Sequence, residues 1–562
     1  MKLIKSGILS LFLLSLFGLD SKALTSNNYK LDAVINSQQR NIQGTNEITY
    51  YNNSKENIDK IYLTLGLNDS YDTKMKVTEV TDNSGTILPS GLYRYRYLGR
   101  EIEDKAIYQV SLPNAITPGE STNIKVKFDV SNLTKTNGII FLDDSLNDKY
   151  SGSWYPKVIN FSNGYWKKRD FPQVNYEADL TVNNDDIIVT SGIELSTDNN
   201  GGKGIKKISY KLNNIRSFSV ALSSLLIAEN DLTKEGTIIK SYYKNNRASN
   251  WNRTIIENTK EILSFYYKKF GVYPYKQLSI IPGNTYNKGG YADTNLIVLH
   301  ESLEKGKNKN DINNNLNWYL AYTIAQQYFG HLVAESGEYP EWISQGASLH
   351  LASSYLKEKS GTLNNYNDYI KQYIDASKAN FNTKILQPVD ELEKGNFEWQ
   401  SIIEKGKSAQ IFKMLEALAG RKALQDSMKD LITKYQNDFV DVSTFEKVLE
   451  TYYPKPLDSF FQQWVQENKK LDYAISSVKQ GKVGNKFKIQ LGVKRIGKAI
   501  MPVSIAFTLR NGSKAFQVWD GSTTEATLTY EFNESVKFVE MDLAQTLPDT
   551  DRSNNTVNVM GI

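Results

Sequence analysis

The segment YTIAQQYFG, residues 322–330, lies at the centre of the stretch that decides the fold of this chain. It belongs to a longer run, 316–332, that is apolar almost all round a helix, and this pattern predicts a buried helix. A second segment, WISQGAS at 342–348, follows Pro340, which suits the first turn of a helix. The centre of the chain therefore predicts two consecutive helices.

Helical periodicity continues on both sides of this pair. Residues 249–270 carry apolar side chains at helical spacing and are followed by Gly271, a helix-ending signal. Residues 305–315 are polar and rich in Asn and Lys, which predicts a loop. Further helices are expected at about 365–380, 407–419, 421–437, 443–452 and 457–469.

The two ends of the chain show the period of strands instead. Short alternating runs such as 124–130, separated by turn residues, extend from about residue 24 to residue 230 and predict antiparallel strands with one wet face. Alternation returns after Leu471 and predicts a closing β-sandwich. The predicted fold class is α+β multidomain, with an N-terminal antiparallel β-domain at 24–230, a mostly helical domain at 231–472 and a C-terminal β-sandwich at 473–562.

Residues 1–23 have the pattern of a secretory signal peptide. Two early lysines precede an apolar run at 8–19, and Ser21-Lys22-Ala23 places small residues at the −3 and −1 positions of a cleavage site. The alternative is a short membrane anchor, but the run is well below the ~20 residues needed to span hydrocarbon. We therefore expect an exported protein that is secreted, periplasmic or associated with the cell envelope, with no transmembrane span.

Composition excludes several classes of protein. A length of 562 residues excludes a single small domain, and 40% hydrophobic residues exclude a disordered chain. Because 67 Lys and Arg nearly balance 62 Asp and Glu, the chain has no electrostatic footprint for nucleic acid. The absence of Cys excludes disulfides and every thiol-based site.

Six short segments resemble, in order, the motifs of the alanyl-aminopeptidase type zinc metallopeptidases, peptidase family M1, which are gluzincins. They are FGVYPY at 270–275 (family FG-x-YP), GGYADTNLI at 289–297 (GAMENWGLI), YTIAQQYFG at 322–330 (HELAHQWFG), WISQGAS at 342–348 (WLNEGFA), IEKG at 403–406 (YEKG) and FFQQW at 460–464 (FF-x-QW). The resemblance implies a β-domain, a thermolysin-like domain and often a β-sandwich, which is the order that periodicity predicts.

The residues that perform the family's chemistry are replaced. In the family, two His four residues apart hold zinc together with a Glu from the next helix, and the Glu after the first His is the general base. Here Tyr322 and Gln326 stand in place of the two His, Thr323 in place of the base and Gln345 in place of the third ligand. The 19-residue step from Gln326 to Gln345 equals the family's. Because a carboxamide and a protonated phenol are weak donors, we expect zinc to be absent and no cofactor.

The loop and the oxyanion position have changed as well. Ala292 stands where the family's Glu holds the substrate amino group, and Ile403 stands where a Tyr stabilises the oxyanion. We therefore expect no catalytic and no metal residue, and a degenerate cleft that is a possible ligand-binding site. Its predicted residues are Gly289, Gly290, Ala292, Tyr322, Thr323, Gln326, Gln345 and Ile403. The side chains of Tyr322, Gln326 and Gln345 should converge beneath a strand containing 290–296.

The sequence offers residues for two other kinds of site, a metal pair and a nucleophilic serine. His331 and Glu335 are four residues apart and form a possible metal pair if a helix continues through them, whereas His350 lies about 140° round its helix from Gln345. Serines lie near the degenerate cleft at positions 344, 348 and 408, but no His is placed by sequence to activate them.

Three functions follow from this reading of the sequence. The leading hypothesis is an exported aminopeptidase-fold protein without peptidase activity that binds a peptide or protein partner. The first alternative is a hydrolase of the zinc metallopeptidase family with a rearranged active site, which zinc content would reveal. The second is a structural or interaction protein of the envelope or the extracellular space, in which side chains such as Tyr322 fill the cleft.

Overall fold

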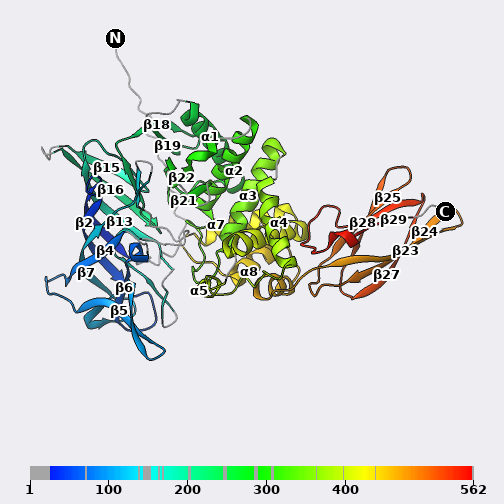
Figure 1. Ribbon diagram of the computed structural model, residues 1–562, viewed down its shortest axis with the longest axis horizontal. Coiled ribbons are helices and arrows are strands. Elements are labelled where there is room, and N and C mark those ends of the chain that lie inside the picture. Colours follow the sequence, from blue (N-terminus) through cyan, green and yellow to red (C-terminus); the bar gives the residue numbers. More distant parts are fainter. Residues whose placement is uncertain are drawn as a thin grey trace, which may run out of the picture.

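The chain forms three regions that follow one another along the long axis of the molecule (Figure 1). A β-rich N-terminal region lies at one end, a helical region in the centre and a second β-rich region at the other end, so the predicted α+β multidomain class is confirmed. The computed structural model describes residues 26–69, 73–136, 139–142, 153–162, 165–167, 170–199, 204–244, 250–283, 289–304, 309–361, 364–395, 398–436 and 438–559. The predicted signal peptide at 1–23 lies outside the described residues.

The N-terminal region is built around a seven-stranded sheet with the order β15-β16-β13-β1-β2-β7-β4. Alternate residues of β1 are buried, as the period-two pattern predicts. The pairing is not purely antiparallel, because β1 runs parallel to β13, a contact between segments far apart in the chain. The strands of this region are β1 (Asn28–Asn36), β2 (Asn41–Tyr51), β3 (Ile58–Thr64), β4 (Lys74–Asp82), β5 (Ser90–Tyr97), β6 (Arg100–Ile116), β7 (Ser121–Ser131), β8 (Lys135–Thr136), β9 (Ile139–Leu142), β10 (Lys157–Val158), β11 (Asn160–Ser162), β12 (Tyr165–Lys167), β13 (Val174–Asn183), β14 (Ile187–Thr190), β15 (Ile193–Asp198), β16 (Ile205–Ile215) and β17 (Val220–Ser223).

A five-stranded mixed sheet links this region to the helices. Its order is β18 (Leu226–Leu232), β19 (Ile238–Lys244), β20 (Gln277–Gly283), β22 (Leu296–His300) and β21 (Gly290–Asp293). Parallel strands β19 and β20 are connected through helix α1 (Asn250–Phe270), the helix predicted at 249–270. Strand β21 is an edge strand, which brings the predicted loop motif next to the central helices.

The central helices follow the predicted order, but the short helix α5 (Val389–Leu392) was not predicted and two further differences appear. Helix α2 begins at Lys309, inside the segment predicted as a polar loop. Two segments are π-helical, at Gln400–Lys407 and Gln462–Gln466. The remaining helices are α2 (Lys309–Tyr328), α3 (Trp342–Ser360), α4 (Asn364–Lys378), α5 (Val389–Leu392), α6 (Ser408–Ala419), α7 (Arg421–Lys434), α8 (Val442–Tyr452) and α9 (Asp458–Phe461).

The C-terminal region is a two-sheet sandwich. One sheet has the order β23 (Tyr473–Val483), β24 (Lys486–Arg495), β27 (Glu525–Phe532), and the other β26 (Lys514–Trp519), β25 (Val503–Leu509), β28 (Val536–Met541), β29 (Thr556–Asn558). Phe507 of one sheet packs on Tyr530 and Phe532 of the other, with ring centroids 5.2 and 5.1 Å apart. The alternation after Leu471 therefore arises from two inner faces that share one core.

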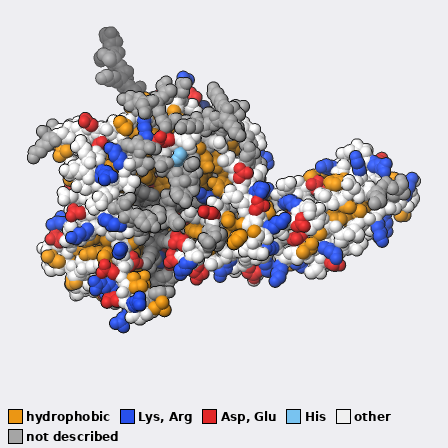
Figure 2. Space-filling view, in the orientation of Figure 1, with side chains coloured by type: hydrophobic (Ala, Val, Ile, Leu, Met, Phe, Trp, Pro, Cys, Tyr) orange, Lys and Arg blue, Asp and Glu red, His pale blue; other side chains and the backbone are white. Residues whose placement is uncertain are grey.

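The surface carries both signs of charge in mixture. Lys and Arg side chains are interspersed with Asp and Glu over the face drawn in Figure 2, in keeping with the near-balanced composition. Among the helices of the described segments, none combines the length and apolar character that a membrane crossing requires.

Candidate functional site

Three of the predicted side chains meet in one chain of hydrogen bonds. Gln326 Nε2 donates to Tyr322 Oη at 3.2 Å, and the Tyr322 hydroxyl donates to Gln345 Oε1. Tyr322 and Gln326 come from one face of α2, and Gln345 comes from the first turn of α3. All three residues are buried, with no more than 6% of their surface exposed. The structure thus brings together the positions that the helical spacing and the 19-residue step predict.

Burial also fixes the protonation of the phenol. Desolvation raises the pKa of Tyr322 well above its usual value, and the negative potential of Glu404 and Glu341 acts in the same direction. The hydroxyl therefore keeps its proton and remains a hydrogen-bond donor.

The edge strand β21 lies directly on α2 beside this group. A Cβ atom built on Gly289 would stand 2.2 Å from Cε1 of Tyr319, and one on Gly290 would stand 2.8 Å from Cγ2 of Thr323. Only glycine permits this approach. Gln327 holds the following loop in place, since its Nε2 donates to Asp293 O at 2.9 Å. The predicted placement beneath residues 290–296 agrees with these contacts, but these residues form β21, a turn at 294–295 and the start of β22, and not a single strand.

The other predicted positions belong to packed structure. Thr323 Oγ1 donates to the carbonyl of Tyr319 at 2.7 Å, so its hydroxyl bonds its own helix. Ala292 and Ile403 are buried, at 2% and 0% exposure, and present only aliphatic side chains. These three residues offer neither a base nor an oxyanion donor.

The converging residues do not fit zinc. Zinc is bound by thiolate, imidazole or carboxylate groups, whereas this set offers a protonated phenol and two neutral carboxamides. Their polar atoms also bond one another, so binding a cation would first break those hydrogen bonds.

Several half-buried side chains around Tyr322 were not among the residues predicted from the sequence. Lys405 Nζ lies 6.0 Å from the ring centroid of Tyr322 and 5.9 Å from that of Tyr369. Glu341 and Glu404 lie close together, because Glu404 Oε1 accepts the backbone N–H of Glu341 at 3.2 Å. Desolvation, followed by the charge of Glu404, raises the pKa of Glu341 to about 8. Glu404 and Lys405 belong to the IEKG segment at 403–406, whereas Glu341 directly precedes the segment at 342–348.

The two alternative sites take other shapes in the structure. Helix α2 ends at Tyr328, so His331 and Glu335 do not share a helical face and the i, i+4 pairing is wrong. His331 Nε2 contacts Ala292 O at 3.3 Å, whereas Glu335 Oε2 accepts the N–H of Ser344 at 2.7 Å.

Glu335, His350 and two of the serines that lie near the degenerate cleft in the sequence also contact other groups. Glu335 stabilises the start of α3, because a carboxylate is favoured at a helix N-terminus. His350 points toward Glu416, 3.6 Å away, on the far side of α3 from Gln345. Ser348 and Ser408 donate to the carbonyls of Phe329 and Ile403.

Comparison with known proteins agrees with this geometry. Residues 254–464, from α1 to the π-helical turn after α9, match the family model described as the peptidase family M1 domain. A search of curated protein sequences found no significant match. The matched segment contains every residue of the Tyr322 group and of the half-buried set around it.

Proposed function

Since the chain has a domain of peptidase family M1 at residues 254–464, with an aminopeptidase-like fold, we propose that it has no peptidase activity and acts by binding a peptide or protein. The observation that supports this most directly is the hydroxyl of Tyr322, which bonds Gln345 and Gln326 where the family's ligands would converge. The fold keeps the spacing of the three ligand positions, but the side chains at these positions bond one another and leave no ligand for zinc. We therefore expect the fold to be used for binding without peptide hydrolysis.

The half-buried residues beside Tyr322 favour a peptide with a free amino terminus. Glu341 and Glu404 place two carboxylates together, and a cation between them would lower the raised pKa of Glu341. The ring of Tyr369, 5.9 Å from Lys405 Nζ, and the nearby ring of Tyr319 offer apolar area for a side chain. The carboxylates of Glu341 and Glu404 would supply the negative charge that the family's loop Glu provides and that Ala292 lacks.

We expect the purified mature protein to contain less than stoichiometric zinc and to leave aminoacyl reporter substrates uncleaved. Metal analysis by mass spectrometry and a panel of reporters with different amino-terminal residues measure both quantities. Chelator-sensitive cleavage together with about one zinc per chain would instead establish the rearranged hydrolase.

A second arm of the same experiment examines binding. Short peptides with free and with acetylated amino termini are titrated by calorimetry, and only the free peptides should bind. Glu341→Gln should weaken that binding, whereas Glu398→Gln, a carboxylate of the same helical region outside this group, provides the matched control.

One observation favours a structural role as the second candidate. Each converging residue is buried, so Tyr322 fills the space that the family keeps for metal and substrate. If no peptide binds while Tyr322→Ala lowers the melting temperature, the group serves packing alone.

We further propose that the protein is exported, as the pattern of residues 1–23 indicates. Expression of the full chain in a bacterium with a general secretion pathway should give a mature protein whose first residue is Leu24. Amino-terminal sequencing of the fraction outside the cytoplasm decides this, and a cytoplasmic product that starts at Met1 would refute export.

A further inference from the structure

A cavity of about 880 Å³ lies between the central helices and the C-terminal sandwich. Its walls come from the end of α1, from α3, α4, α6 and α7, and from the loop that joins β28 to β29. It includes His350, which faces away from Gln345, so the cavity is separate from the Tyr322 group. Its volume is that of a site for a small organic molecule.

The lining is richer in cations than in carboxylates. Six Lys and Arg side chains face four Asp and Glu side chains: Lys269, Lys357, Lys371, Lys413, Arg421 and Arg552 against Glu358, Asp368, Glu416 and Asp549. His350 adds no charge at neutral pH, because burial lowers its pKa to about 4. Two of these cations are paired with carboxylates just outside the wall, Lys371 with Asp375 and Arg552 with Asp542. The positive charge that is left without a direct partner is therefore local and lies at individual lysines.

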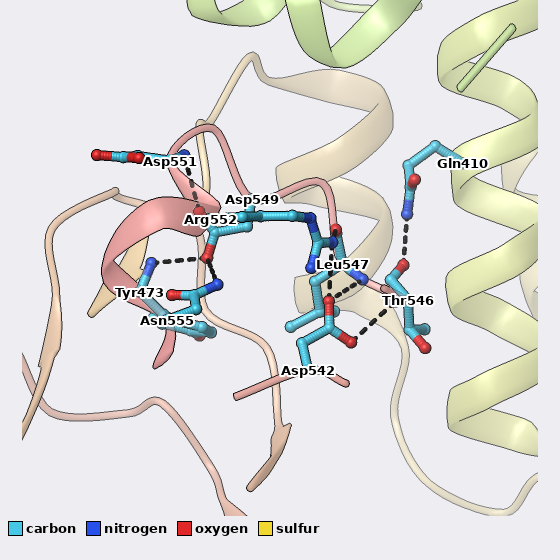
Figure 3. A network of polar contacts seen from close by, with 9 residues as sticks. All are labelled: Gln410, Tyr473, Asp542, Thr546, Leu547, Asp549, Asp551, Arg552 and Asn555. Atoms are coloured by element: carbon cyan, nitrogen blue, oxygen red, sulfur yellow. Dashed lines mark hydrogen bonds and ion pairs between the residues drawn. The ribbon is translucent and has the colours of Figure 1, made fainter. Parts of the chain in front are cut away.

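The carboxylates in the interior already have partners. Glu416 accepts from Arg421 Nε at 2.8 Å, and Asp549 accepts from the backbone N–H of Tyr473 and from Asn555 on its sandwich side. Figure 3 shows Asp549 bonded toward these sandwich residues. The other two carboxylates are exposed, where solvent screens them.

Two lysines in the described part of the wall make no direct ion pair with a carboxylate. In the part of the chain that the structure describes, the half-buried Lys413 makes no hydrogen bond or ion pair, and Lys269 has only the amide of Gln425 at 3.4 Å and the ring of Phe265. Desolvation lowers the pKa of both lysines. Carboxylates act on them from beyond ion-pair distance, Glu358 and Glu416 on Lys269 and Asp542 on Lys413. Each lysine is therefore a partly desolvated cation to which a bound anion would add a direct partner.

The sandwich side of the cavity is held in position before any ligand arrives. Gln410 of α6 donates to the carbonyl of Thr546 at 2.6 Å, while Asp542 accepts from the N–H groups of Thr546 and Leu547 and from Arg552 (Figure 3). The loop is thus tied both to the helices and to itself. Preorganisation of this kind reduces the entropy lost on binding.

We propose that this cavity binds a small organic or inorganic anion that carries at least two carboxylate or phosphate groups, with Lys269 and Lys413 as its principal contacts. The ligand would contact both the helical region and the sandwich, because the walls of the cavity come from both. Anion binding in this cavity would depend neither on peptide binding beside Tyr322 nor on zinc.

Calorimetric titration of the mature protein with citrate and, separately, with inorganic pyrophosphate tests this proposal. At least one anion should bind with Kd below about 1 mM at low salt, and the stronger of the two identifies the group that the cavity prefers. The double variant Lys269→Gln, Lys413→Gln should lose at least about tenfold in affinity, since two charge-assisted hydrogen bonds disappear.

A matched control separates local contacts from general charge. Lys422→Gln removes a cation of α7 that is exposed, paired with Asp426 at 2.6 Å and absent from the cavity wall, so it should leave affinity unchanged. The double variant should also melt no lower than the unmodified protein, because it removes two partly desolvated charges that make no ion pair. Weak binding of both anions, or binding that the double variant retains, would overturn the proposal.

Discussion

A variant with Tyr322→His, Thr323→Glu, Gln326→His and Gln345→Glu is expected to bind zinc with a micromolar or tighter Kd. Hydrogen bonds already join the three ligand positions through Tyr322, so the backbone holds them within reach of one ion. Two imidazoles and a carboxylate would then replace a phenol and two carboxamides. Titration with zinc by calorimetry measures the affinity directly.

Activity of this variant should remain low. Position 323 lies against Gly290, since a Cβ there would come within 2.8 Å of Thr323 Cγ2, so a longer side chain has little room to hold a water. Ile403 supplies no oxyanion donor, and loss of such a donor alone costs roughly 10²–10³ in rate. The variant is therefore a test of metal binding and not of catalysis.

A three-fold variant that keeps Thr323 serves as the control for this experiment. It should bind zinc about as tightly as the four-fold variant, because position 323 supplies no metal ligand. A folded variant that binds no zinc would mean that the surroundings of the three positions have been rebuilt, and that their convergence is no remnant of a metal site.

The features that follow from local sequence were predictable. Alternation and helical periodicity depend on which face of an element is buried, so the strands of both β regions and helix α1 agree with their predicted positions. The convergence of Tyr322, Gln326 and Gln345 was predictable for the same reason, because it needs only a helical repeat and a fixed step.

Features that depend on partners distant in the chain were not predictable. The parallel pairing of β1 with β13 joins strands separated by more than a hundred residues, and nothing in either strand encodes its neighbour. His331 was placed on a helix that in fact ends at Tyr328, since the periodic apolar run continues past the last helical turn. Glu341 and Glu404 are 63 residues apart, and only the fold brings the two carboxylates together.

Arg216 illustrates how much such long-range contacts contribute, and its replacement by Met is expected to be strongly destabilising. Its guanidinium is buried and donates to three backbone carbonyls, those of Phe171 at 3.0 Å, His331 at 3.2 Å and Asp438 at 2.8 Å. The first belongs to the N-terminal region and the other two to the helical region, so one side chain joins the two. Burial lowers the pKa of Arg216 only to about 10, so it remains charged at neutral pH.

Met fills similar space but donates no hydrogen bond, so Arg216→Met removes the donor to the Phe171 carbonyl. The carbonyls of His331 and Asp438 keep only longer hydrogen bonds of 3.4 Å, from Gln173 Nε2 and from the N–H of Ala334. A buried carbonyl left without a donor costs about 1–3 kcal/mol. We expect a loss of about 3 kcal/mol after the desolvation cost of the guanidinium is recovered, which corresponds to a fall in melting temperature of roughly 6–12 °C. Arg253→Met removes an exposed arginine paired only with Glu257 and should change the melting temperature by less than about 2 °C. Differential scanning calorimetry measures the melting temperatures of both variants and shows whether the hydrogen bonds of Arg216 stabilise the fold. Equal melting temperatures would mean that apolar packing alone holds the N-terminal region on the helices, whereas a fall confined to Arg216→Met would assign that attachment to one buried cation and the carbonyls of three separate segments.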